Sequence, residues 1–133
     1  VQPTSDIVAT DFDGDGKLEI LTFSKFHGDT LAIWHEGQTR DRYEQVWCDP
    51  QKRSFLHALW AADLNGEKCA VIGNRKDGRD LLLVRYVDGE YTVDVIDHDL
   101  GPANCMVYRH DGSDYIVAAY RETDQLALYK VVE

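Results

Sequence analysis

The segment Leu31-Ala32-Ile33-Trp34-His35 decides the fold, because its pattern recurs twice further along the chain. Each copy has Leu, any residue, an aliphatic residue, a bulky residue and a basic residue. The other two copies are Leu81-Leu82-Leu83-Val84-Arg85 and Leu126-Ala127-Leu128-Tyr129-Lys130. The basic residues that end the copies are therefore 50 and then 45 positions apart. A fixed spacing of this size indicates a repeat architecture.

Further strand-like segments precede each copy in the same order. They are short, rich in β-branched and aromatic residues, and separated by turn residues such as Asn65-Gly66 and Asp88-Gly89. The first set covers residues 6–10, 57–62 and 104–109, and the second covers 18–23, 69–73 and 115–119. Residues 42–48 and 90–96 alternate in period two and predict a fourth strand for the first two repeats. No segment keeps a 3.6-residue apolar period, so almost no helix is expected.

Four antiparallel strands in each repeat of 45–50 residues predict the blades of an all-β propeller. The expected blades cover about residues 5–49, 55–98 and 103–133, the third with three strands. Closed propellers typically have four to eight blades. Residues 1–133 are therefore expected to be a partial propeller: a fragment of a longer one, or one of several chains that complete a ring. Open blade edges also predict self-association.

The strongest chemical motif is Asp11-Phe12-Asp13-Gly14-Asp15-Gly16-Lys17-Leu18-Glu19. Calcium prefers six to eight hard oxygen ligands, and alternating carboxylates that curl around an ion supply them. The two glycines allow the positive-φ backbone that such a curl requires. An EF-hand begins in the same way, but it needs a glutamate at position 12, where this chain has Thr22, and helices on both sides. An acidic turn without a metal is the remaining alternative.

Residues 6–21, with this motif at their centre, resemble the FG-GAP/VCBS repeat of calcium-binding β-propellers. In that family a D-x-D-G-D-G-x-x-D/E loop joins the innermost strand of a blade to the next strand and holds calcium. The resemblance implies Ca²⁺ in a structural role and favours an extracellular or periplasmic location. The implied ligands are the side chains of Asp11, Asp13, Asp15 and Glu19 and the carbonyl of Lys17.

The corresponding loops of the other two repeats depart from the motif. The second, residues 63–68, lacks two of the acidic positions and a glycine, so a tight turn without a tightly bound ion is expected. The third, residues 109–114, has lost the site.

The opposite end of the expected channel is the second candidate site. His57 opens the innermost strand of the second repeat, and Lys25, Arg75 and Arg121 follow the second strands. These residues predict binding of an acidic glycan or a protein, and they resemble in outline the propeller-type polysaccharide lyases and sugar dehydratases, which use a channel histidine. The alternatives are a packed, hydrogen-bonded His57 and salt bridges between blades. The other four histidines, His35 among them, are expected to be exposed.

Composition limits the function classes. A formal charge of −10 argues against nucleic acid and anionic membranes as partners. No apolar run is long enough to span a bilayer, and no signal peptide is recognisable. Cys48, Cys69 and Cys105 form no CxxC pair, so neither a zinc knuckle nor a disulfide framework is indicated. Two classes remain: a calcium-stabilised module that presents a binding face, and part of a carbohydrate-active enzyme with His57 as the catalytic residue.

Overall fold

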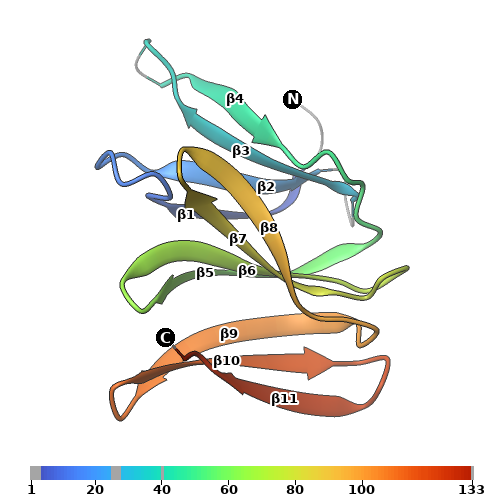
Figure 1. Ribbon diagram of the computed structural model, residues 1–133. Helices are drawn as coiled ribbons and strands as arrows, with labels where there is room; N and C mark the ends of the chain where they lie inside the picture. The colour runs from blue at the N-terminus through green and yellow to red at the C-terminus, as the bar shows by residue number, and fades with distance from the viewer. Residues whose placement is uncertain (1–3, 25–27, 40, 133) are drawn as a thin grey trace.

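The computed structural model describes residues 4–24, 28–39 and 41–132, which form eleven strands in three antiparallel sheets (Figure 1). The described residues contain no helix, and hence none that could cross a membrane. The first sheet has β1 (Thr4–Thr10), β2 (Glu19–Ser24), β3 (Thr30–Glu36) and β4 (Tyr43–Cys48) in sequence order. The second has β5 (Leu56–Leu64), β6 (Glu67–Asn74), β7 (Leu81–Val87) and β8 (Glu90–Asp97), and the third has β9 (Pro102–His110), β10 (Ser113–Tyr120) and β11 (Gln125–Lys130).

The structure confirms the all-β prediction and all eleven expected strands, within two residues at each end. The strands group into sheets as the repeats predict, four, four and three, with neighbours in sequence paired as antiparallel neighbours in the sheet. Strands β1 and β2 flank the acidic loop where an EF-hand would need helices. None of the three sheets closes on itself.

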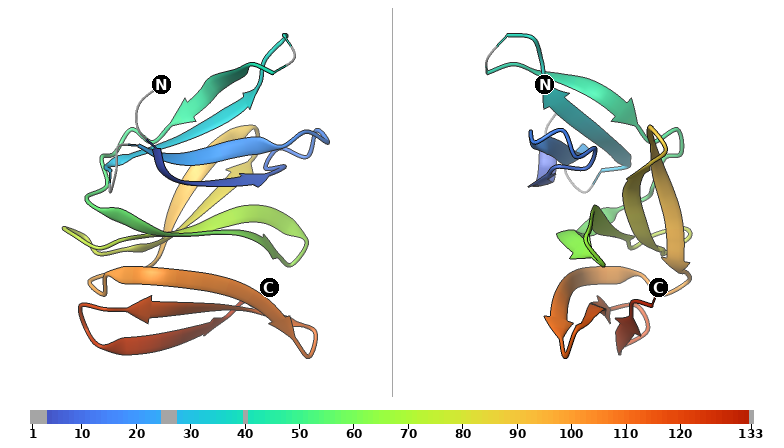
Figure 2. Two further views of the ribbon diagram at one scale, coloured as in Figure 1. Left: turned by 180° about the vertical axis from the view of Figure 1, so that it is seen from behind. Right: turned by 60° about the vertical axis from the view of Figure 1, so that its left-hand side comes forward.

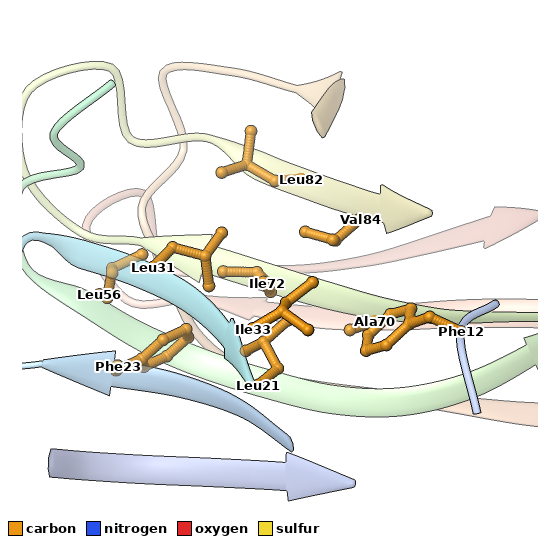
Figure 3. Packing of buried hydrophobic residues seen from close by; sticks show 10 residues of the cluster. All are labelled: Phe12, Leu21, Phe23, Leu31, Ile33, Leu56, Ala70, Ile72, Leu82 and Val84. Atoms are coloured by element: carbon orange, nitrogen blue, oxygen red, sulfur yellow. The ribbon is translucent and has the colours of Figure 1, made fainter. Parts of the chain in front are cut away.

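The three sheets are stacked, with the second between the other two (Figures 1 and 2). One apolar core lies between the first and second sheets, shown in Figure 3. The first sheet and its acidic loop contribute Phe12, Leu21, Phe23, Leu31 and Ile33, and the second contributes Leu56, Ala70, Ile72, Leu82 and Val84. A second core lies between the second and third sheets.

The middle sheet is buried on both faces, because successive residues of a strand point to opposite sides. In β6, Ala70 and Ile72 face the first sheet, whereas Cys69 and Val71 face the third. This explains why residues 69–73 are a continuous apolar run rather than an alternating one. Burial raises the pKa of the Cys69 thiol to about 12, so it behaves as a small apolar side chain. Cys48, in contrast, is exposed.

Close contacts hold the third sheet against the second. The Tyr129 hydroxyl donates a hydrogen bond to Asp97 of β8 at 2.7 Å. Pro102, at the start of β9, packs on the backbone of Gly73 in β6, leaving no room there for a side chain. The absence of a Cβ at Gly73 therefore sets how closely the two sheets approach.

The two outer faces of the stack are left uncovered by the described residues. On the third sheet, Met106, Val117 and Leu128 lie in one register row, and Met106 and Leu128 are exposed. On the first sheet, Ile20 and Trp34 line a groove with polar neighbours, among them Thr22, which accepts a hydrogen bond from the Trp34 indole at 3.0 Å. The end faces therefore differ in chemistry as well as in position.

Replacing Gly73 with alanine should destabilise the protein by about 1 to 3 kcal/mol, because the new methyl group would overlap Pro102. Chemical denaturation would measure the loss. Gly37→Ala is the matched control, since a Cβ there meets only the flexible side chain of Glu44. Adding Pro102→Ala to Gly73→Ala should restore part of the stability. Equal effects of Gly73→Ala and Gly37→Ala would contradict the close approach of the sheets.

Candidate metal centre

The acidic loop between β1 and β2 is anchored in the core by Phe12. Its side chain is buried and its ring meets that of Tyr91, on β8, edge to face with centroids 6.1 Å apart. The Phe12 amide donates a hydrogen bond to Oε2 of Glu19 at 2.6 Å. This hydrogen bond ties the start of the loop to its end without the help of an ion.

The turn itself is shaped by Asp11 and two glycines. Gly14 and Gly16 have φ values of 75° and 87°, in the region that glycine adopts without strain. This backbone directs amides inward: those of Asp15 and Gly16 donate to the two carboxylate oxygens of Asp11, at 3.1 and 2.9 Å. Asp11 therefore organises the loop.

Four side chains converge beside this turn: Asp13, Asp15, Glu19 and His35. Each offers one ligand atom, and these atoms all lie within 4.8 Å of one another. The structure thus brings together three of the predicted ligands, while Asp11 is not in the group. The backbone amide of Lys17 donates a hydrogen bond to Asp15 at 2.7 Å. The role of the Lys17 carbonyl oxygen as a metal ligand stays a prediction.

His35 is the member that the sequence analysis missed, and its expected exposure was wrong. Its side chain is only 19% exposed, on β3. Nδ1 lies 2.8 Å from the carbonyl oxygen of Glu36, and Nε2 lies 2.8 Å from Asp15 and 3.4 Å from Oε1 of Glu19. If Nδ1 donates to that carbonyl, Nε2 of the neutral ring carries no proton, and its lone pair points toward the carboxylates that would share a cation with it.

The repeat itself holds a signal for His35. In the second sheet Arg85, the counterpart of His35, forms an ion pair with Glu67, the first residue of β6, at 3.7 Å. The register pairs Ile20 with Trp34, which brings the next pair of residues, Glu19 and His35, together. In the second sheet the corresponding pair is Cys69 and Arg85, and Glu67 lies two residues before Cys69. The two repeats therefore share a basic residue that contacts a carboxylate of the second strand, but not the position of that carboxylate.

Glu19 is the least satisfied group of the cluster. Its side chain is fully buried, and Oε1 makes no hydrogen bond although the His35 ring is at ion-pair distance. Burial raises the pKa of Glu19, whereas the Lys17 amide and His35 lower the pKa of Asp15. The pKa of His35 is raised, first by the contact of its ring with the carbonyl oxygen of Glu36 and then by the carboxylate of Asp15. A buried carboxylate oxygen that accepts no hydrogen bond and faces two further carboxylates fits a cation ligand.

In the corresponding loops of the second and third sheets, residues 63–68 and 109–114, the acidic side chains pair with basic groups or backbone amides of the protein. Asn65 and Gly66 form a two-residue turn with positive φ values, as expected from the sequence. In the same hairpin Asp63 pairs with the ammonium group of Lys68 at 2.8 Å. In the third sheet the buried carboxylate of Asp114 accepts hydrogen bonds from the Asn65 amide at 2.7 Å and from Arg109 at 3.0 Å.

Two of the four residues predicted for the opposite face, His57 and Arg75, contact the third sheet or the loop that follows β10. His57 Nδ1 lies 2.6 Å from the carbonyl oxygen of Ala103 on β9, and its ring stacks on Phe55. Arg75 binds Glu122 at 2.8 Å, and its guanidinium lies over the same Phe55 ring. These contacts are the structural alternatives considered for His57 and Arg75. Arg121 is exposed, and Lys25 lies outside the described residues.

Comparison of the chain with models of known protein families, with curated proteins and with solved structures finds no match.

Replacing Glu19 with glutamine should stabilise the chelated protein by roughly 1 to 3 kcal/mol, because a buried charge disappears. The folded-state pKa of Glu19 is raised, so the ionised form opposes folding above that pKa. The gain over wild type should shrink as the pH falls through the raised pKa, where the wild-type carboxyl is protonated too. Thermal unfolding in a chelator, near neutral pH and in mildly acidic buffer, measures both effects. A lower melting temperature for Glu19→Gln at neutral pH would contradict this account.

Proposed function

We propose that the chain is a calcium-stabilised module of a β-propeller of the FG-GAP/VCBS type, which presents binding surfaces rather than catalysing a reaction. The observation that carries the proposal is the buried Oε1 atom of Glu19, which lacks a hydrogen bond and faces Asp13, Asp15 and His35. A cation there would satisfy a group that otherwise costs stability.

Calcium fits this donor set best because oxygen ligands dominate it. Asp13, Asp15 and Glu19 supply carboxylates, Asp11 lies at the same turn, and all four come from nine consecutive residues. Loop ligands of this kind suit the flexible, high-coordination shell of Ca²⁺. The nitrogen of His35 suits a transition metal better, so Mn²⁺ and Zn²⁺ are the competitors to test.

The stacked sheets support the propeller assignment. Sheets of four antiparallel strands, repeated along the chain and packed face to face, are how propeller blades are built. Further blades, from a longer chain or from other copies, would cover the outer faces and complete the ring.

The proposed role of the metal is structural. The loop joins the first two strands of a sheet, and Phe12 ties it to the core beneath. The hydrogen bond of His57 to Ala103 and its stacking on Phe55 favour a structural role for this histidine over the lyase or dehydratase alternative.

Saturating Ca²⁺ should raise the melting temperature of the chelated protein by on the order of 10 °C, since an ion at 100 times its Kd stabilises by about 2.7 kcal/mol. Asp13→Asn should remove most of this shift. Asp63→Asn, in the corresponding loop of the second sheet, is the matched control and should retain it, because Asp63 already pairs with Lys68.

Titrations with Mn²⁺ and Zn²⁺ complete the test. A larger shift in melting temperature with either ion than with Ca²⁺ would assign the site to that metal and not to calcium. No shift with any of the three ions would refute the metal centre.

A further inference from the structure

A groove of about 780 Å³ lies between the first and second sheets, next to the acidic cluster. Strand β4, the loop between β1 and β2, and the β7–β8 hairpin meet there. The residues that line it include Asp13, Asp15, Trp47, Tyr86, Glu90 and Tyr91. The site predicted on the opposite face, with His57 and Arg75, shares no residue with this groove.

Three aromatic rings form one wall of the groove. Tyr91 lies between the other two, with its ring centroid 6.0 Å from that of Trp47 and 4.9 Å from that of Tyr86. Their planes are inclined to Tyr91 by 41° and 59°, so the rings do not stack flat on one another. Each ring is half-buried, and Tyr91 is braced from behind by Phe12 of the core. The aromatic wall is therefore formed before a ligand arrives.

The remaining polar residues of the groove are mostly acidic. Asp13, Asp15 and Glu90 contribute carboxylates, and none of the described lining residues is Lys or Arg. The one basic side chain, His35, is already engaged by Asp15. Carboxylates beside aromatic faces attract cations and repel anions, since the face of an aromatic ring is itself electronegative.

A bound divalent ion would not reverse this preference. The four carboxylates of the loop, Asp11, Asp13, Asp15 and Glu19, exceed the two charges of such an ion and the one charge of Lys17 taken together, and Glu90 adds a further negative charge at the rim. The groove therefore keeps its negative potential whether or not the proposed metal is present.

We propose that this groove binds an alkylated ammonium group, with the cation against the rings of Trp47, Tyr86 and Tyr91 and its charge balanced by Glu90. Aromatic rings combined with a carboxylate recognise such cations because the large, weakly hydrated head is desolvated at little cost. The same electrostatics disfavour an acidic glycan in this groove. The proposal concerns a different ligand from the metal and does not depend on it.

Titration of the intact chain with choline chloride, followed by NMR chemical shifts, tests the proposal. The matched probe is 3,3-dimethylbutan-1-ol, which has the shape of choline but no charge. Choline should bind at least about tenfold more tightly than this alcohol, and Trp47→Ala should weaken binding by a similar factor. Trp60→Ala is the control variant, because Trp60 lines a separate groove between the second and third sheets.

Each titration is run both in chelator and in calcium, so that the two sites are judged separately. Choline binding in chelator supports the groove even if no calcium-induced melting shift occurs. Equal affinity for choline and the alcohol would overturn the cation assignment, and so would an unchanged affinity in Trp47→Ala. A trimethyllysine peptide as a further arm distinguishes a protein partner from a small molecule. Tighter binding of the peptide than of choline would assign a methylated protein segment.

Discussion

Burial of both faces of the middle sheet is the constraint on which the rest of the molecule depends. One row of β6 side chains enters each core, and the glycine that ends the apolar run lets the third sheet approach. A sheet covered on one side only would tolerate polar residues in alternate positions, as β2 of the first sheet does with Thr22 and Ser24 on its outer face. The stack is therefore cooperative through its centre: loss of either neighbour would expose one face of the same four strands.

The acidic loop is held in its conformation by packing of Phe12 in the core between the first and second sheets. Phe12 is at once a core residue, the donor of a hydrogen bond to Glu19 and the support of Tyr91. One aromatic side chain thus connects packing between the sheets, the convergence of the carboxylates and the wall of the neighbouring groove. The proposed metal site and the proposed ammonium site are adjacent because both depend on the same buried ring, not because they share a ligand.

Sequence alone was sufficient for the strands and for most of the acidic cluster, because both are encoded locally: strands in alternation and turn residues, the loop in nine consecutive positions. It did not predict His35, whose approach to Glu19 depends on the register between β2 and β3. It did not predict the groove either, since Trp47 and Tyr91 belong to different sheets. The basic residues at the opposite face were found, but the pattern could not choose between a ligand and Glu122 as the partner of Arg75. Contacts between sheets are where local patterns stop being informative.

The two uncovered faces of the stack have a geometric consequence. The row of Met106, Val117 and Leu128 at one end differs from the face that carries Ile20 and Trp34 at the other. A contact that joins these ends is heterologous, because the outer face of the third sheet in one copy would meet the outer face of the first sheet in the next copy. Repetition of such a contact gives a closed ring only if the rotation that relates one copy to the next divides the full circle evenly; otherwise it gives a filament. The rotation accumulated over the three sheets of a copy, together with that of the contact itself, thus decides between a finite assembly and a polymer.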